Sequence, residues 1–317
     1  MKLRISLAVI ATCVSLAFGA SSANAQATRT WVSGVGDDVN PCSRTAPCKT
    51  FSGAISKTAA GGEINCLDPG GFGAVTITKS MTISCPYTEG GALAGGNGIT
   101  VNAGPTDVVY LRGLDIFGVN PPIHGVRFIA GGALHIEDCV IRRFNAANSF
   151  GVSFTPNGTS RLFISNTLIA NNGTATTGGG INIQPSLGGT ANVFLNNVRI
   201  VDNAFHAINF NNTAITGNLS NLVITDSVIF GNGENALNAS TNANVLSIML
   251  SDVVIANNKR GLVLAGAGLN ARIGGSTIAS SGSAIQLSAG AVLQSYKNNL
   301  IDLNSNNGTP IPQAALN

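Results

Sequence analysis

The chain has 317 residues, of which only 10% are charged, and its formal net charge is +3. An ordinary soluble domain has about 25% charged residues, and a long-helix protein needs abundant Glu, Lys and Leu, so this composition argues against a coiled coil. The 44% hydrophobic content argues against a disordered chain. A nucleic-acid-binding protein is also disfavoured, because a charge of +3 neutralises few phosphates. Gly (39) and Asn (36) are abundant instead.

The first residues have the pattern of an export signal. Lys2 and Arg4 precede an apolar run over residues 5–18, and Ala23-Asn24-Ala25 offers small residues for signal peptidase. We therefore expect a signal peptide over residues 1–25 and a mature protein that is secreted, periplasmic or held in the cell envelope. A membrane anchor is the alternative, but the run is shorter than the roughly 18 residues that a span needs. No later stretch approaches that length, so we expect no membrane span after signal removal.

A repeated pattern of short alternating segments decides the fold class. Seven segments align without gaps on one apolar anchor each, spaced by 23 to 31 residues: Leu111, Ile136, Ile164, Leu195, Ile224, Leu250 and Ile273. The residue two positions after each anchor is Gly, Asn or Asp, and Asn recurs eight positions after four of them. These residue types favour bends, so each unit is predicted to be strand, bend, strand, bend, strand and loop.

Units of this length bury their apolar sides only by stacking. The sequence therefore predicts an all-β fold, a parallel β-helix (a solenoid) of about ten coils over residues 63–303. Asn side chains at stacked bends are expected to form ladders along its axis. A sandwich of β-hairpins is the rival, but hairpins do not explain why unlike loops separate like strands.

Five cysteines remain after signal removal, and an oxidising compartment permits disulfides. Cys66 and Cys85 occupy equivalent positions in adjacent predicted coils, and a strand spacing near 4.8 Å lies in the range that a disulfide accepts. We predict a Cys66–Cys85 bridge and expect Cys42 and Cys48 to close a short Pro-containing loop. The last cysteine, Cys139, is expected to be a buried free thiol.

The open end of a solenoid needs a cap, because exposed strand edges aggregate. Residues 49–60 have apolar residues at helical spacing, which predicts an amphipathic capping helix. The predicted organisation is thus a signal peptide (1–25), an N-terminal cap segment with a helix (26–62), the β-helix (63–303) and a C-terminal tail (304–317).

The N-terminal segment also resembles a known family. Trp31-Val-Ser-Gly-Val-Gly-Asp-Asp38, Asn40-Pro-Cys42 and Pro47-Cys-Lys-Thr-Phe51 resemble the start of secreted right-handed parallel β-helix proteins of the pectin-lyase-like superfamily. With the coils, the resemblance covers about residues 29–303. It implies a right-handed β-helix, and enzymes of this superfamily act on acidic polysaccharides along one outer sheet. Of the galacturonan hydrolase motifs, the chain has His124-Gly125 but no Asn-Thr-Asp and no Arg-Ile-Lys.

One outward row of side chains is the candidate site. Positions flanking the anchors point outward because side chains alternate along a strand. We expect Tyr110, Arg112, His135, Glu137, Phe163 and Phe194, with Arg127 from the same coils, to bind a glycan. If the protein is a lyase, His135 or Tyr110 would take a proton while Arg112 neutralises the uronate. The alternative is structural: Arg112 pairs with Glu137 and the aromatic row lies under a loop or the tail.

We expect no cofactor and no metal site, because Ca²⁺ needs several clustered carboxylates and the outward acids are isolated. A calcium site at Asp138, Asp226 and Asp252 is the alternative, although these positions are first explained as bends.

The C-terminal coils have an apolar exterior, with Val223, Met249, Val228 and Val254 predicted to face outward. Such a lateral face is expected to be a homo-oligomer contact or to be covered by the tail. For function, the scarcity of outward acids and the missing motifs favour a non-catalytic exported protein that binds a polysaccharide, a cell-surface glycan or another surface through its lateral face. A polysaccharide lyase or other carbohydrate-active enzyme is the alternative.

Overall fold

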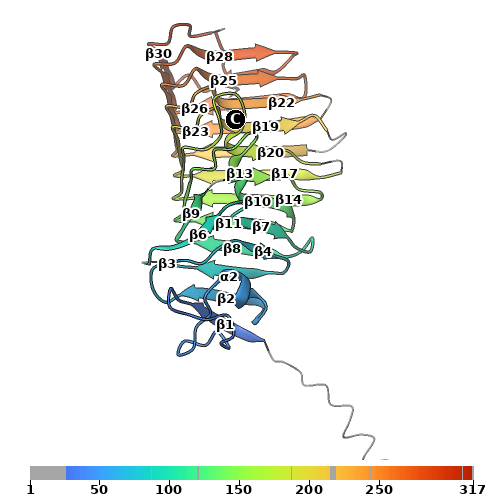
Figure 1. Ribbon diagram of the computed structural model, residues 1–317. Coiled ribbons are helices and arrows are strands. Elements are labelled where there is room, and N and C mark those ends of the chain that lie inside the picture. Colours follow the sequence, from blue (N-terminus) through green and yellow to red (C-terminus); the bar gives the residue numbers. More distant parts are fainter. Residues whose placement is uncertain are drawn as a thin grey trace, which may run out of the picture.

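The computed structural model describes residues 26–315, apart from residues 87, 120, 187, 215–218, 243 and 309. The predicted signal peptide, residues 1–25, lies outside the described residues. The chain winds into a stack of coils, from β1 at one end to β30 at the other (Figure 1). Strands of successive coils pair in parallel, and they form three sheets of 11, 10 and 9 strands. The predicted all-β parallel β-helix is thus confirmed.

We name the sheets A, B and C in the order in which each coil visits them. Sheet A consists of β1 (Ala27–Val32), β2 (Thr58–Cys66), β5 (Met81–Ser84), β8 (Val108–Arg112), β11 (Ala133–Glu137), β14 (Thr159–Ser165), β17 (Thr190–Asn196), β20 (Leu219–Thr225), β23 (Val245–Ser251), β26 (Leu269–Gly274) and β29 (Val292–Ser295). Sheet B consists of β3 (Gly70–Gly71), β6 (Gly90–Ala94), β9 (Leu114–Gly118), β12 (Val140–Arg142), β15 (Leu168–Ala170), β18 (Arg199–Val201), β21 (Val228–Phe230), β24 (Val254–Ala256), β27 (Thr277–Ala279) and β30 (Leu300–Asp302). Sheet C consists of β4 (Val75–Ile77), β7 (Ile99–Asn102), β10 (His124–Ala130), β13 (Phe150–Phe154), β16 (Gly179–Ile183), β19 (His206–Asn212), β22 (Asn235–Thr241), β25 (Arg260–Ala265) and β28 (Ser283–Ser288).

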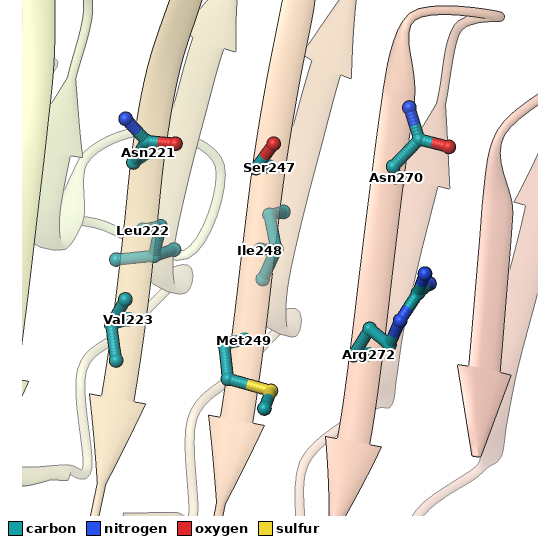
Figure 2. Close-up of a pocket in the computed structure, with 8 residues that line it drawn as sticks. All are labelled: Asn221, Leu222, Val223, Ser247, Ile248, Met249, Asn270 and Arg272. Atoms are coloured by element: carbon teal, nitrogen blue, oxygen red, sulfur yellow. The ribbon is translucent and has the colours of Figure 1, made fainter. Parts of the chain in front are cut away.

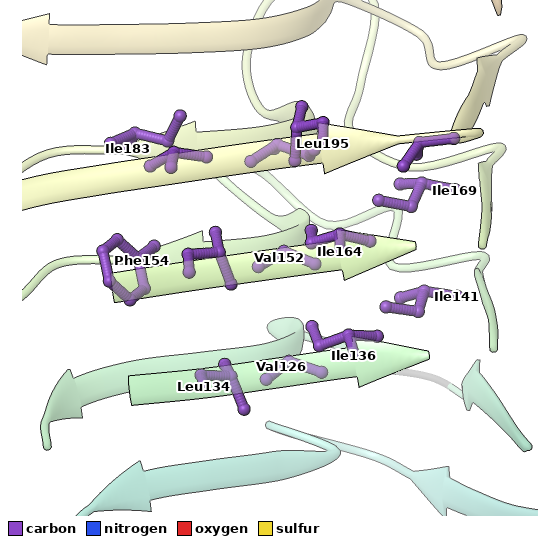
Figure 3. Close-up of a cluster of buried hydrophobic side chains, with 14 of the residues drawn as sticks. Val126, Leu134, Ile136, Ile141, Val152, Phe154, Ile164, Ile169, Ile183 and Leu195 are labelled. Atoms are coloured by element: carbon purple, nitrogen blue, oxygen red, sulfur yellow. The ribbon is translucent and has the colours of Figure 1, made fainter. Parts of the chain in front are cut away.

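The core lies inside the coil, where equivalent residues stack along the axis. The seven predicted anchors are register partners in sheet A, from Leu111 through to Ile273, and all are buried. Figure 3 shows Ile136, Ile164 and Leu195 stacked in this way, with the matching rows of sheets B and C facing them. Each added coil therefore buries the inward apolar residues of its three strands against those of the neighbouring coils. A single coil cannot bury these residues by itself.

The first bend, between sheets A and B, needs a left-handed backbone. The predicted bend residues all have positive φ, between 49° and 63°: Gly113, Asp138, Asn166, Asn197, Asp226, Asp252 and Gly275. Gly, Asn and Asp reach this region at the lowest cost, which explains their recurrence.

The second bend, between sheets B and C, carries the predicted ladder of buried Asn side chains. The Asn172 amide donates to Asn203 at 3.0 Å, Asn203 to Asn232 at 3.0 Å, and Asn232 to Asn258 at 2.9 Å. The side-chain oxygens of Asn203, Asn232 and Asn258 also accept the backbone N–H of the ladder Asn in the coil before, and that of Asn172 accepts the backbone N–H of Phe144. Because these bends are buried, the ladder satisfies polar groups that would otherwise lose their water.

The N-terminal end is capped by a shorter helix than predicted. The helix α2 spans only Phe51–Ile55, and Thr58 already belongs to β2. Thr58 belongs to sheet A instead, because it pairs with Ala27 of β1 and its hydroxyl shares a hydrogen bond with that of Thr30. Phe51 and Ala54 are still buried, as an amphipathic cap requires.

Both predicted disulfides form, and the tail covers the other end. Cys42–Cys48 has a Cα–Cα distance of 4.6 Å, and Cys66–Cys85 joins neighbouring coils at 4.9 Å. At the C-terminal end, Gln313 bridges to Ser295 of the edge strand β29, and the Ala284 amide of the edge strand β28 donates to Asn306. No helix in the described part of the chain is long and apolar enough to cross a bilayer.

We predict that Asn203→Ala lowers the free energy of unfolding by about 1–3 kcal/mol, because it leaves buried donors and acceptors unpaired on both sides. Asn209→Ala is the matched control, since Asn209 forms an equivalent ladder with Asn182 and Asn238 on the half-buried exterior of sheet C. Urea unfolding followed by circular dichroism measures both variants. Equal losses would show that burial of the ladder is unimportant.

Cys139 is a free thiol in the core, and burial raises its pKa to about 12. We predict no reaction with Ellman's reagent at pH 8 until the chain is unfolded. The folded chain keeps the thiol proton up to about pH 12, whereas the unfolded chain loses it above 9.0. Cys139 therefore lowers stability as pH rises through this range. Rapid labelling of the native protein at pH 8 would contradict this placement.

Candidate functional site

One continuous row of outward side chains runs along the exterior of sheet A. Register pairing places the predicted aromatic residues and the apolar residues of later coils in this single row, which we call the central row: Tyr110, His135, Phe163, Phe194, Val223, Met249 and Arg272. Six strand spacings of about 4.8 Å make it roughly 29 Å long. The predicted aromatic site is therefore one half of a longer feature.

The aromatic half of the central row is a stack. The rings of Tyr110 and His135 are stacked at 4.4 Å between centroids, and those of His135 and Phe163 at 4.5 Å. Both faces of the imidazole are thus covered by neighbouring rings, and the stack presents ring edges outward. Phe194 continues the row and is 39% exposed.

Arg112 and Glu137 neutralise each other beside this stack. The Arg112 Nε donates to Glu137 Oε2 at 2.8 Å, and the guanidinium lies 4.9 Å from the centre of the Tyr110 ring. The structure therefore contains the Arg112–Glu137 ion pair that the structural alternative predicts. The His135 Nδ1 lies 4.0 Å from Glu137 Oε1.

Burial is the main cause that lowers the pKa of His135 below 6.5, and Arg161 and Arg112 lower it further. The negative charge of Glu137 opposes this shift, because it attracts the protonated imidazole. The imidazole is therefore neutral at pH 7, as a general base must be. The positive charge that a lyase needs to neutralise the uronate carboxylate during proton removal is already compensated on Arg112.

Other predicted members lie elsewhere. Arg127 is in β10 of sheet C, so it does not join the central row on sheet A. Val228 and Val254 lie on sheet B, whereas Val223 and Met249 lie on sheet A, so the apolar exterior is two faces rather than one. Side-chain alternation along a strand predicts that a residue points outward. It does not predict which of the three sheets carries that residue.

The three acids at the first bends do not lie together: Asp226 and Asp252 follow the neighbouring strands β20 and β23, whereas two strands of sheet A separate Asp138 from them. Asp138, Asp226 and Asp252 each follow a different strand of sheet A. Within the described residues, no group of three or more His, Cys, Asp or Glu side chains could hold a metal ion.

A groove at the corner between sheets A and B was not found from the sequence. It has a volume of about 780 Å³, and its lining includes Arg112, Asp138, Glu89, Thr88 and Ser84. Glu89 lies outside the aligned repeat segments, so the repeat gave no signal for it. The groove brings one cation and two acids together, which makes it mixed in charge.

A second hollow lies at the other end of the central row. Its volume is about 280 Å³, and its exterior lining combines Val223 and Met249 with Asn221, Ser247, Asn270 and Arg272. Figure 2 shows these residues side by side on β20, β23 and β26. The lining contains no acid, and Arg272 forms no ion pair within the described part of the chain. The sequence pattern could have found it, because Arg272 directly precedes an anchor.

Comparisons with known proteins identify the fold of this chain, but they do not assign it to a family. No family model and no curated protein matches the sequence. Among solved structures, the crystal structure of pectate lyase Pel9A superimposes with a TM-score of 0.58 at 15% identity, over 92% of this chain and 83% of that one. The chain has the parallel β-helix fold of that pectate lyase. At this identity the likeness concerns the fold alone.

Histidine titration tests the electrostatics of the site. Burial lowers the pKa of His124 and of His206 to about 4, and the pKa of His135 is also lowered. We predict that all three histidines titrate below 6.5 by NMR, and that Glu137→Gln moves His135 still lower. Because the unfolded chain binds these protons first, stability should fall as the pH drops from 6.5 towards 4. A His135 pKa above 6.5 would contradict the described surroundings.

Proposed function

We propose that this is an extracytoplasmic, non-catalytic protein that binds an acidic polysaccharide along the central row of sheet A. The observation that carries the proposal is Arg272, a guanidinium that forms no ion pair with any described residue and lies beside an apolar hollow whose lining contains no acid. A cation that the protein itself does not compensate is available to a ligand carboxylate.

The hollow suits a uronic acid residue. The C–H face of a sugar ring would pack on Val223 and Met249, and the carboxylate would bind Arg272. Neutral hydrogen-bonding groups border the row on both sides, with Asn221, Ser247 and Asn270 on one side and Thr225 and Ser251 on the other. An amide both donates and accepts, so such borders fit sugar hydroxyls without adding charge. Phe194, next along the row, extends the apolar floor.

Two further observations support this proposal. The solved neighbour with the same fold is by its name a lyase of pectate, a polyuronate. The two disulfides and the expected signal peptide are consistent with an oxidising compartment outside the cytoplasm.

The catalytic alternative is a lyase that uses His135, Arg112 and Tyr110. The neutral imidazole of His135 favours it, because a base must be deprotonated to act. The Arg112–Glu137 pair counts against it, and so does the enclosure of His135 between two rings. We therefore place ligand binding, not bond cleavage, at this face.

We predict that the protein binds polygalacturonate in isothermal titration calorimetry and that Arg272→Gln weakens binding about tenfold or more. A charged hydrogen bond contributes about 1.5–3 kcal/mol, which sets this scale. Arg44→Gln, an exposed residue of the N-terminal segment, is the matched control and should bind normally. Methyl-esterified polygalacturonate should bind weakly to all three proteins, because it lacks the carboxylate.

The same samples are followed by ultraviolet absorbance for unsaturated uronides. We expect no product. Equal binding by Arg272→Gln and the original protein would contradict the proposed site, and steady product formation would establish the lyase instead.

A further inference from the structure

The exterior of sheet B is largely apolar from β12 to β30. Alternate residues of each short strand point outward and form two rows in register. One row is Val140, Leu168, Arg199, Val228, Val254, Thr277 and Leu300, and the other is Arg142, Ala170, Val201, Phe230, Ala256, Ala279 and Asp302. Phe230, Val254 and Leu300 are 43%, 42% and 71% exposed. A contiguous exposed apolar face of this kind marks an interaction surface.

Beyond β12, the two rows contain one cation and one anion. Arg199 in β18 forms no side-chain hydrogen bond or ion pair within the described residues, and Asp302 in β30 forms no ion pair there. The face is otherwise apolar or small. Arg142, at its start, is already bound to Asp115 by two hydrogen bonds of 3.0 and 2.6 Å.

The positions of these two charges indicate an antiparallel two-fold arrangement. In sheet B, β18 and β30 are separated by β21, β24 and β27, so β24 lies midway between the charges. A two-fold axis along β24 exchanges β18 with β30 and β21 with β27. Because this axis keeps each residue in its own row, Arg199 of one copy then lies opposite Leu300 of the other. Asp302 of that copy lies two residues further along the same strand, an offset of about 7 Å that the long Arg199 side chain can cover.

The side-chain sizes agree with the same axis. Phe230 and Ala279 belong to one row, and the axis places the exposed ring of Phe230 over the small Ala279 of the second copy. Val254 meets its own equivalent at the centre. A parallel arrangement would leave Arg199 opposite Val201, with no partner for either charge.

Terminal segments cover strands at both ends of the solenoid, which disfavours end-to-end contact with a second copy. α2 packs against β1, β2 and β4 at one end, and the C-terminal tail covers β28 and β29 at the other. A covered edge does not accept a strand from another chain, so association is lateral. The acids Asp226 and Asp252 lie in the exposed first bends that border sheet B and so remain at its solvated rim.

We propose that sheet B binds a second copy of this chain to form an antiparallel dimer centred on Val254, with Arg199 and Asp302 paired across the interface. The dimer leaves sheet A of each copy open, because sheets A and B are different sides of the coil (Figure 1). This inference does not depend on the ligand of sheet A.

Sedimentation velocity of the full purified protein over a wide concentration range tests the dimer. We expect a dimer for the original protein and a monomer for Val254→Asp. Val245→Asp is the matched control, because Val245 is 46% exposed but lies on sheet A, and it should remain dimeric. Circular dichroism confirms that each variant is folded. A monomeric original protein, or a dimeric and folded Val254→Asp, would overturn the proposal.

A charge exchange tests the predicted pairing separately. Arg199→Glu and Asp302→Arg should each raise the dimer dissociation constant about tenfold or more, because each places like charges together. The double variant should return it to within a fewfold of the original value. A double variant as weak as the single ones would show that the two charges do not meet and would contradict the antiparallel register.

Discussion

Parallel strands in register impose one constraint on this entire molecule: each side chain has as its neighbour the equivalent side chain of the next coil, about 4.8 Å away. Like charges in such a row would repel at every step, whereas identical amides, hydroxyls and rings attract one another. The buried ladder of Asn172, Asn203, Asn232 and Asn258 follows from this constraint. So does the low charge of the chain, since only 10% of its residues are charged.

The same constraint explains the character of the exterior. Tyr110, His135 and Phe163 stack because they are register partners, and Arg112 meets Glu137 for the same reason. A charge in this fold is therefore either compensated in an adjacent coil or left without a partner. Among the residues that the structure describes, Arg272 and Arg199 belong to the second kind, and they lie on two different faces. We assign sheet A to a charged ligand because the lining of the hollow beside Arg272 contains no acid. We assign sheet B to a second copy because the face that carries Arg199 also carries Asp302.

Much of the fold could be predicted from the sequence, because aligning one repeat unit with the next shows which residues are partners in adjacent coils. The anchors, the left-handed bends and the Cys66–Cys85 bridge depend only on the alignment of one unit with the next. The capping helix was predicted too long, because helical spacing in residues 49–60 does not reveal that Thr58 pairs with β1 of sheet A. Local pattern identifies an element better than it identifies where tertiary contacts end it.

The site was only partly predictable. Side-chain alternation indicated that Tyr110, His135 and Phe163 face outward together. It did not indicate that Val228 lies on sheet B whereas Val223 lies on sheet A. Whether a cation is compensated depends on side-chain geometry, so Arg112 attracted attention and Arg272 did not. The corner groove with Glu89 lies outside the repeat and offered no signal.

The location of the ligand on sheet A can be observed directly through methionine methyl groups. Met249 lies on the central row, whereas Met81 is buried in the core at 2% exposure. In a methyl-labelled sample titrated with polygalacturonate, the NMR signal of Met249 should shift progressively while that of Met81 stays unchanged. Binding that leaves the Met249 signal in place would contradict the assignment of the ligand to this face.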